Sequence, residues 1–189
     1  MSKGYSGLFH GTLGSTFING SSKEESYKDR GIDVPESVKS ALSQLKKAGD
    51  YIKGTKDSYS MQDVSVMSKE TGVEFARVTI DDETILIRGD KGGAVIPDRI
   101  LERMSKNKGT LDFHSHPHNN DNVPSVDDRN TMNKLEKKTG QKTSKIVTPN
   151  GRVTTFDKSG VVEVNTVSNK IDAKHKKALM DLFGGGSND

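Results

Sequence analysis

Two histidines placed one residue apart, at the end of an apolar run, constrain this chain more than any other feature. Residues 111–117 read L-D-F-H-S-H-P, a pattern that predicts a β-strand ending at the proline. Side chains alternate between the two faces of a strand, so His114 and His116 point to the same side and can both reach a single ion. The sequence therefore predicts a metal site at a strand end.

A serine and an aspartate three residues apart follow a polar loop, at an expected helix start. Ser125 is placed to act as the N-cap of a helix, with Asp128 three positions on, and Met132 and Leu135 continue on the Asp128 side of that helix. Asp128 would then lie in the first turn of a helix whose inner face is packed. Imidazole and carboxylate ligands suit Zn²⁺, and three protein ligands with water in the fourth position is the catalytic arrangement.

Composition limits the number of domains, the class of partner and the types of metal ligand. A chain of 189 residues is long enough for one ordinary domain, but 29% charged against 30% apolar residues suggests that part of the length is tail. The net charge of +3 is too small and too dispersed to indicate a nucleic-acid-binding protein. Because the chain has no cysteine, disulfides, thiolate nucleophiles and cysteine-bound zinc are excluded, so a metal would sit on histidine and carboxylate ligands.

No apolar run approaches the length of a membrane span, and the first residues lack the apolar segment of a signal peptide. We therefore expect a soluble protein with no membrane partner. The expected location is the cytoplasm, or the outside of the cell after export without a recognisable signal peptide.

The predicted organisation is an arm, one domain and a tail. Residues 1–34 are rich in Gly and Ser and predict a loose arm or linker, residues 35–183 the domain, and residues 184–189 a flexible tail. The domain opens with a helix at Pro35, whose expected apolar stripe is Val38, Ala41, Leu42, Leu45 and Ile52. From Gln62 the period changes, and Val64 and Val66 alternate with polar residues in the manner of a strand.

The rest of the domain alternates between strands and helices. Residues 72–80 and 84–88 predict a hairpin, and Pro97 opens a short helix with Ile100 and Met104 on its inner side. After the helix that Ser125 begins, three short strands are expected within residues 144–148, 151–156 and 160–164, followed by a basic amphipathic helix at about residues 168–183.

Glu74 has an unusual place in the first strand of the hairpin. It shares a face with Ala76, Val78 and Ile80, so a carboxylate would point into the core if that face is the buried one. Such burial is costly unless the carboxylate meets a cation, a metal-bound water or a hydrogen-bond partner. Two other interpretations remain: the opposite face, with Val73 and Phe75, is buried, or Glu74 lies at an exposed strand end.

The spacing from His114 to Asp128 is H-S-H-P-x7-S-x-x-D, and this resembles the JAMM motif of the JAB/MPN metalloprotease family. The resemblance covers roughly residues 60–165 and implies an α/β fold: a single MPN/JAB-like domain with a mixed β-sheet flanked by helices. It implies Zn²⁺ on His114, His116 and Asp128, with Ser125 donating a hydrogen bond to the developing oxyanion. The family's upstream catalytic glutamate corresponds best to Glu74, with Glu70 and Glu83 as alternatives on either side.

The resemblance also implies a function, the zinc-dependent hydrolysis of peptide or isopeptide bonds. The expected partner is a protein or peptide substrate, such as ubiquitin or a ubiquitin-like modifier joined to lysine, or another protein tail. The Gly-rich arm and polar composition look more like a bacterial, phage or polymorphic-toxin module than a eukaryotic proteasomal subunit. Substrate identity, organism and oligomeric state are not given by the sequence.

Two alternatives belong to other classes. One is a catalytically silent MPN-like module that binds zinc for its shape and serves as an interaction scaffold. The other is a metal-dependent phosphodiesterase or nuclease in which His118 adds a further ligand, since residues 114–118 read H-x-H-x-H. We instead expect His118 to be solvated or near the ligands without binding the metal, and His10 and His175 to be unrelated to it.

Overall fold

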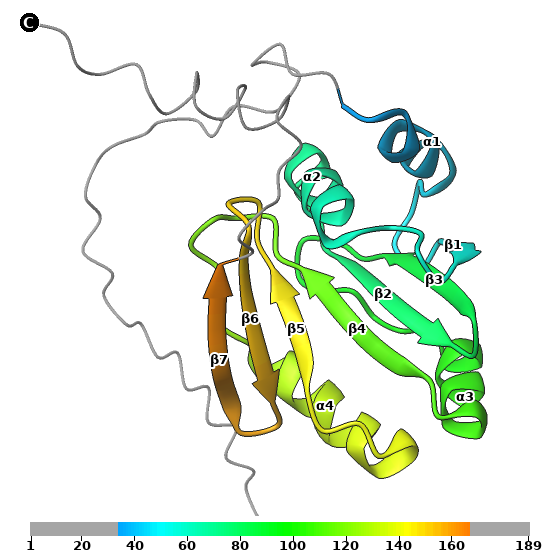
Figure 1. Cartoon of the computed structure of the whole chain (residues 1–189), viewed down its shortest axis with the longest axis vertical. Helices are drawn as coiled ribbons and strands as arrows, with labels where there is room; N and C mark the ends of the chain where they lie inside the picture. The colour runs from blue at the N-terminus through cyan, green and yellow to red at the C-terminus, as the bar shows by residue number, and fades with distance from the viewer. Residues whose placement is uncertain (1–33, 167–189) are drawn as a thin grey trace, which may run out of the picture.

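A seven-stranded sheet forms the centre of the molecule (Figure 1), in the order β1-β3-β2-β4-β5-β6-β7. The computed structural model describes residues 34–166. The sheet is mixed, because β4 and β5 pair in parallel and the other neighbours pair antiparallel. The strands are β1 (Tyr51–Thr55), β2 (Phe75–Ile80), β3 (Glu83–Arg88), β4 (Thr110–Ser115), β5 (Ser144–Val147), β6 (Arg152–Asp157) and β7 (Gly160–Thr166).

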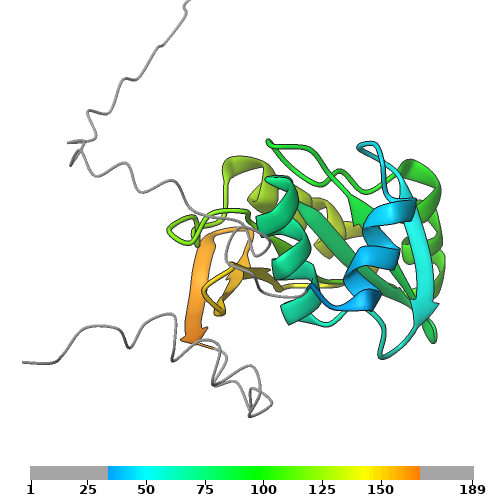
Figure 2. The same cartoon turned by 90° about the horizontal axis from the view of Figure 1, so that it is seen from above.

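Helices cover both faces of the sheet, which gives three layers (Figures 1 and 2). Helices α1 (Glu36–Gln44) and α2 (Met61–Thr71) pack on one face, and α3 (Asp98–Asn107) and α4 (Val126–Thr139) on the other. The sequence prediction of an α/β domain with a mixed sheet flanked by helices is confirmed at this level.

The core is divided between the two faces because both sides of the central strands are apolar. The α1–α2 side includes Phe75, Leu86 and Phe113 from the sheet. The α3–α4 side includes Ala76, Val78 and Ile80, the residues predicted to share a face with Glu74. Both faces of β2 are therefore buried, and Glu74 lies directly before the strand, with only 8% of its surface exposed.

Most of the predicted elements are present. Pro35, Pro97 and Ser125 are the N-caps of α1, α3 and α4, and residues 75–88 form the expected hairpin. The three short strands expected after residue 140 are β5, β6 and β7.

Two predicted elements were wrong. Residues around Val64 and Val66 form helix α2 and not a strand. The prediction failed because five consecutive residues of this helix are buried, so its apolar residues do not recur at the helical period. These buried residues are Val64, Ser65, Val66, Met67 and Ser68. Ile52 does not extend the first helix, which ends at Gln44, but lies in β1, a strand held by pairing with β3. The predicted arm (residues 1–33 of it), the helix at 168–183 and the tail at 184–189 lie outside the described residues.

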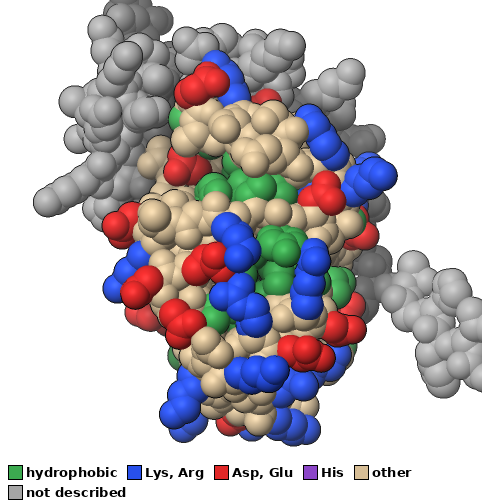
Figure 3. All heavy atoms as spheres, turned by 90° about the vertical axis from the view of Figure 1, so that its right-hand side faces the viewer, with side chains coloured by type: hydrophobic (Ala, Val, Ile, Leu, Met, Phe, Trp, Pro, Cys, Tyr) green, Lys and Arg blue, Asp and Glu red, His purple; other side chains and the backbone are tan. Residues whose placement is uncertain are grey.

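The two edges of the sheet differ in chemistry. At the β1 edge, Lys53 and Arg103 pair with Glu83, and Arg99 lies over the ring of Tyr51, so charged groups surround the small apolar areas seen in Figure 3. The β7 edge instead exposes Val161, Val162 and Val164. Within residues 34–166, no helix has the length and apolar character needed to cross a membrane.

Candidate metal centre

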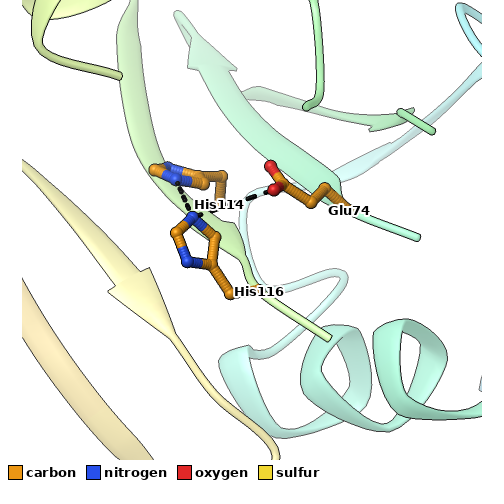
Figure 4. A group of neighbouring side chains, drawn as sticks. All are labelled: Glu74, His114 and His116. Carbon is orange, nitrogen blue, oxygen red and sulfur yellow. Dashed lines mark hydrogen bonds and ion pairs between the residues drawn. The ribbon is translucent and has the colours of Figure 1, made fainter. Parts of the chain in front are cut away.

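Strand register brings Glu74 to the two histidines. In the antiparallel pair of β2 and β4, Ala76 lies opposite His114. Continuing that register by two residues places Glu74 opposite His116, and Glu74 Oε1 lies 3.9 Å from His116 Nε2. Figure 4 shows the Glu74 side chain directed toward both imidazoles.

The serine between the histidines fixes this arrangement from the other face. The fully buried Ser115 accepts a hydrogen bond of 3.0 Å from the backbone N–H of Phe75 through its Oγ. This bond holds the start of β2 against the end of β4, where regular strand pairing stops. Ser115 therefore helps to determine where Glu74 lies, a role that its position between two histidines did not reveal.

The imidazole rings of His114 and His116 converge. Both residues are buried, and their Nε2 atoms lie 3.0 Å apart. His114 also makes an edge-to-face contact with the ring of Phe156 on β6, and this contact restrains the orientation of the imidazole. The shared strand face predicted for the two histidines is confirmed.

Asp128 completes the cluster from helix α4. Its Oδ1 lies 3.1 Å from His114 Nε2 and its Oδ2 lies 3.7 Å from His116 Nε2. The backbone N–H and the hydroxyl of Ser125 donate to Oδ2 at 2.7 and 2.8 Å, and Asp128 N–H donates back to Ser125 Oγ. The predicted capping box is thus present and holds the carboxylate against the histidines.

Asp121, which sequence reasoning missed, orients His116. The Nδ1 atom of His116 lies 2.7 Å from the backbone carbonyl oxygen of Asp121 and 3.3 Å from its carboxylate. A carbonyl oxygen can only accept, so Nδ1 carries the proton and, in the neutral ring, Nε2 has a free lone pair directed into the cluster. This second interaction is typical of metal-binding histidines.

These donors fit a metal ion. Glu74, His114 and His116 are buried and each offers a ligand atom within 4.8 Å of the other two, while Asp128 contacts both histidines. Two nitrogen ligands on one tetrahedral zinc ion lie about 3.3 Å apart, as Zn–N distances of about 2.0–2.1 Å require. The observed separation of 3.0 Å is close to that value. The cluster can therefore hold a metal ion on nitrogen and oxygen ligands.

The ionisable groups of the cluster shift one another's pKa values. Burial disfavours the charged form of His116, but the hydrogen bond to Asp128 and the charges of Glu74 and Asp121 outweigh it and raise the pKa of His116 to about 9. Burial also opposes ionisation of Asp128, yet hydrogen bonds from His114, His116 and Ser125 hold its pKa well below the usual range.

Glu74 is shifted in the opposite direction from Asp128. Burial raises the pKa of Glu74, and the two nearby histidines offset this only in part. The two carboxyl groups of one cluster therefore differ in character: Asp128 is held as the anion, whereas Glu74 takes up a proton more readily.

The other candidates lie elsewhere. Glu83 is at the far end of β3 and pairs with Lys53 and Arg103, and Glu70 belongs to α2 on the opposite face of the sheet. His118 is exposed in the loop after Pro117 and does not join the cluster. His10 and His175 fall outside the described residues. Of the three glutamates considered, Glu74 is the one that reaches the histidines.

Comparisons with known proteins do not assign the chain to a family. No protein-family model, curated protein or solved structure matches the chain. The function must therefore be argued from the residues and their geometry.

Proposed function

We propose that the protein is a zinc-dependent hydrolase of peptide or isopeptide bonds, built on a domain of the MPN/JAB type. The observation that supports this most directly is the convergence of four residues from three separate elements: Glu74 before β2, His114 and His116 at the end of β4, and Asp128 at the start of α4. Their residue types and order in the chain are those implied by the resemblance of the H-S-H-P-x7-S-x-x-D stretch to the JAMM motif.

In this proposal His114, His116 and Asp128 are the zinc ligands. Asp128 contacts both imidazole nitrogens and is anchored by Ser125, as a ligand must be. Glu74 is the general base, the role that the resemblance to the JAMM motif implies for it; its Oε1 lies 3.9 Å from His116 Nε2. At that position the Glu74 carboxylate is within reach of a water molecule beside the histidines.

Bound zinc would polarise the scissile carbonyl group and make a neighbouring water molecule more acidic. Glu74 would accept a proton from the attacking water as the new C–O bond forms. It would then deliver that proton to the leaving nitrogen as the C–N bond breaks, so that the products are a carboxylic acid and an amine. The raised pKa of Glu74 suits a group that must both take and return a proton.

Ser125 is the proposed oxyanion donor, with one qualification from its geometry. Its side chain is the N-cap of α4, and its proton goes to Asp128 Oδ2 at 2.8 Å. For Ser125 to donate to substrate, this hydrogen bond has to be exchanged, while the backbone N–H of Ser125 can continue to hold Asp128 at 2.7 Å. A donor of this kind contributes a few kcal/mol at the transition state.

The substrate that we propose is ubiquitin or a ubiquitin-like modifier joined to lysine, or another protein tail, in a bacterial, phage or polymorphic-toxin setting. The test is cleavage of a panel of ubiquitin conjugates and short peptides by the zinc-loaded protein. Glu74→Gln should keep zinc but lower kcat by about 10²–10⁴-fold, the range for loss of a general base. Glu70→Gln is the matched control, because it removes a carboxyl group outside the cluster.

The same panel separates the alternatives. Bound zinc without zinc-dependent turnover of any substrate would favour the silent interaction module. If His118→Ala removed zinc as completely as His114→Ala, the phosphodiesterase or nuclease alternative would gain and the proposed ligand set would be wrong. Loss of activity in Glu70→Gln with full activity in Glu74→Gln would move the base to α2.

A further inference from the structure

The backbone of Glu74 is held by the turn that follows β3, although Glu74 itself lies just before β2. The regular pairing of β2 with β3 ends at Phe75 and Arg88. Beyond that pair, the N–H of Gly89 donates to the carbonyl oxygen of Glu74 at 2.8 Å, and the N–H of Glu74 donates to the carbonyl oxygen of Asp90 at 2.9 Å. Two consecutive residues of one segment thus bond to a single residue of the other, which is the pattern of a β-bulge.

A bulge of this kind often fixes the direction of a side chain next to a functional site. These two hydrogen bonds continue the extended course of β2 by one residue, so Glu74 keeps the face that it shares with Ala76. Ala76 lies opposite His114. The Glu74 side chain accordingly points toward the imidazoles in Figure 4.

The turn is closed by its own hydrogen bonds and by the absence of a side chain at Gly89. The N–H of Asp90 donates to the carbonyl oxygen of Gly93 at 3.0 Å, and Asp90 Oδ1 accepts from the N–H of Gly92 at 2.7 Å. A Cβ atom at Gly89 would lie against the carbonyl oxygen of Gly93 and 2.7 Å from the Cα atom of Ala94, and both are backbone atoms that cannot rotate away. The turn can therefore close only with glycine at this position.

Two buried serines hold the peptide groups on either side of Glu74. Ser68 Oγ donates to the carbonyl oxygen of Val73 at 2.7 Å, and the N–H of Phe75 donates to Ser115 Oγ at 3.0 Å. Neither serine has any exposed surface. The backbone around Glu74 is thus restrained from both directions by side chains and from the side by the turn. Such support is what a reacting group needs if its position is to stay within about 0.5 Å.

We propose that the turn of residues 89–93 positions the Glu74 carboxylate for proton transfer, with Gly89 and Asp90 as the positioning residues. This inference rests on the proposed function, in which Glu74 accepts a proton from the attacking water. A general base works only within hydrogen-bond reach of that proton, so a small displacement of its backbone lowers the rate. The proposed zinc ligands lie at the end of β4 and the start of α4, so the turn and the metal can be tested separately.

Two alanine substitutions in the turn form a matched pair. Gly89→Ala forces the turn open, whereas Gly92→Ala keeps its N–H and places its Cβ atom 3.5 Å from Asp90 Oδ1, an ordinary contact. In the full, zinc-loaded chain, Gly89→Ala should lower kcat by about 10²-fold, the loss expected when a reacting group moves by about 1 Å. KM and zinc content should not change, and Gly92→Ala should match the wild type. Full kcat in Gly89→Ala, or a raised KM with normal kcat, would overturn the proposal.

A double variant shows whether Gly89 acts through Glu74. Glu74→Gln combined with Gly89→Ala should be no slower than Glu74→Gln alone, because the turn has no effect once the base is gone. A further loss of kcat in the double variant would mean that the turn only supports the fold, and would overturn the proposal.

Asp90 is tested by a conservative rescue. Asp90→Ala should lower kcat, whereas Asp90→Asn should retain it, because the amide oxygen of asparagine can still accept the hydrogen bond from Gly92. Equal kcat values in the two variants would overturn the role of Asp90.

Amide hydrogen exchange tests the turn without any substrate. Gly89→Ala should speed exchange of the Glu74 amide by about tenfold or more, because the amide loses its hydrogen bond, and should leave the Leu86 amide within β3 unchanged. Equal acceleration at both amides would reflect lower stability of the whole domain and would overturn the proposal. If the zinc-loaded wild type cleaved no substrate, the proposed function would be wrong, and exchange at Glu74 would still decide whether the turn holds this residue.

Discussion

Strands β2 and β4 carry two groups of polar side chains on opposite faces of the sheet, and the two differ in how their charges are satisfied. On the α1–α2 side, Arg77 pairs with Asp112 at 2.8 Å. Both charged groups have further hydrogen-bond partners. Thr79 and Thr110 donate to the Asp112 carboxylate, and Arg77 donates to the backbone carbonyl oxygens of Lys56 and Ser58. This group is complete without a ligand.

In the cluster on the other face, the lone pairs and charges are not all matched by protein partners. Two imidazole nitrogens lie 3.0 Å apart, and two carboxyl groups, Glu74 and Asp128, face the same pair. Protons can stabilise this arrangement, as the raised pKa of His116 indicates, but a metal ion does so more fully because it takes the lone pairs of both rings. The comparison separates a polar group that stabilises the fold from one that is arranged to bind.

The largest expected effect comes from removing a histidine. His114→Ala should weaken zinc binding by well over the roughly 10–100-fold that loss of an outer hydrogen-bond partner costs, because it removes a ligand itself. Metal content after gel filtration and competition with a chelator measure this. Arg77→Ala is the counterpart on the other face and should retain full metal content. Retention of tight zinc binding by His114→Ala would place the metal elsewhere.

Arg77→Ala should lower the stability of the fold and leave metal binding unchanged. It leaves the largely buried Asp112 carboxylate without its cation, which costs about 2–4 kcal/mol of unfolding free energy. Urea denaturation of the metal-free protein measures the loss, and Arg77→Lys should recover part of it. A loss below about 0.5 kcal/mol would mean that the pair is only a surface ion pair in its energetics.

Zinc affinity and the stability of the metal-free fold should both depend on pH through His116. His116 must lose a proton to bind a metal, and its raised pKa of about 9 means that the metal-free protein holds that proton through neutral pH. Zinc affinity should therefore rise by up to about tenfold per pH unit below pH 9 and level off above it. The metal-free fold has the reverse trend, since the stability gained from protonated His116 is present below pH 6.5 and lost as the pH rises through about 9.

Calorimetric titration with zinc in buffers of different ionisation enthalpy measures the protons released. Release at pH 7 that disappears above pH 9 would agree with the assignment. A zinc affinity that does not change between pH 6 and pH 9 would contradict it.

The smallest effect concerns Asp121. Asp121→Ala removes the carboxylate at 3.3 Å from His116 Nδ1 but keeps the backbone carbonyl oxygen at 2.7 Å. Zinc affinity should therefore fall by about tenfold, the lower end of the range for such partners. Asp127→Ala, at the neighbouring acidic position in the first turn of α4, serves as the matched control. A loss as large as that of His114→Ala would make Asp121 a ligand.

The sequence by itself determined the parts of this protein that depend on local geometry. Alternation along a strand put His114 and His116 on one face, and the capping pattern put Asp128 in the first turn of α4. Both follow from contacts within a few residues, so the spacing was sufficient. The same reasoning failed for α2, whose consecutive buried residues removed the helical period, and for β1, which exists through its pairing with β3.

Only the tertiary structure decided which glutamate meets the histidines and what orients them. Glu70, Glu74 and Glu83 all lie close together in the sequence, but the register between β2 and β4 brings Glu74 opposite His116. Asp121 reaches His116 because the loop between β4 and α4 folds back over the ring. These contacts depend on how strands and loops from distant parts of the chain pack, and residue spacing carries no information about that.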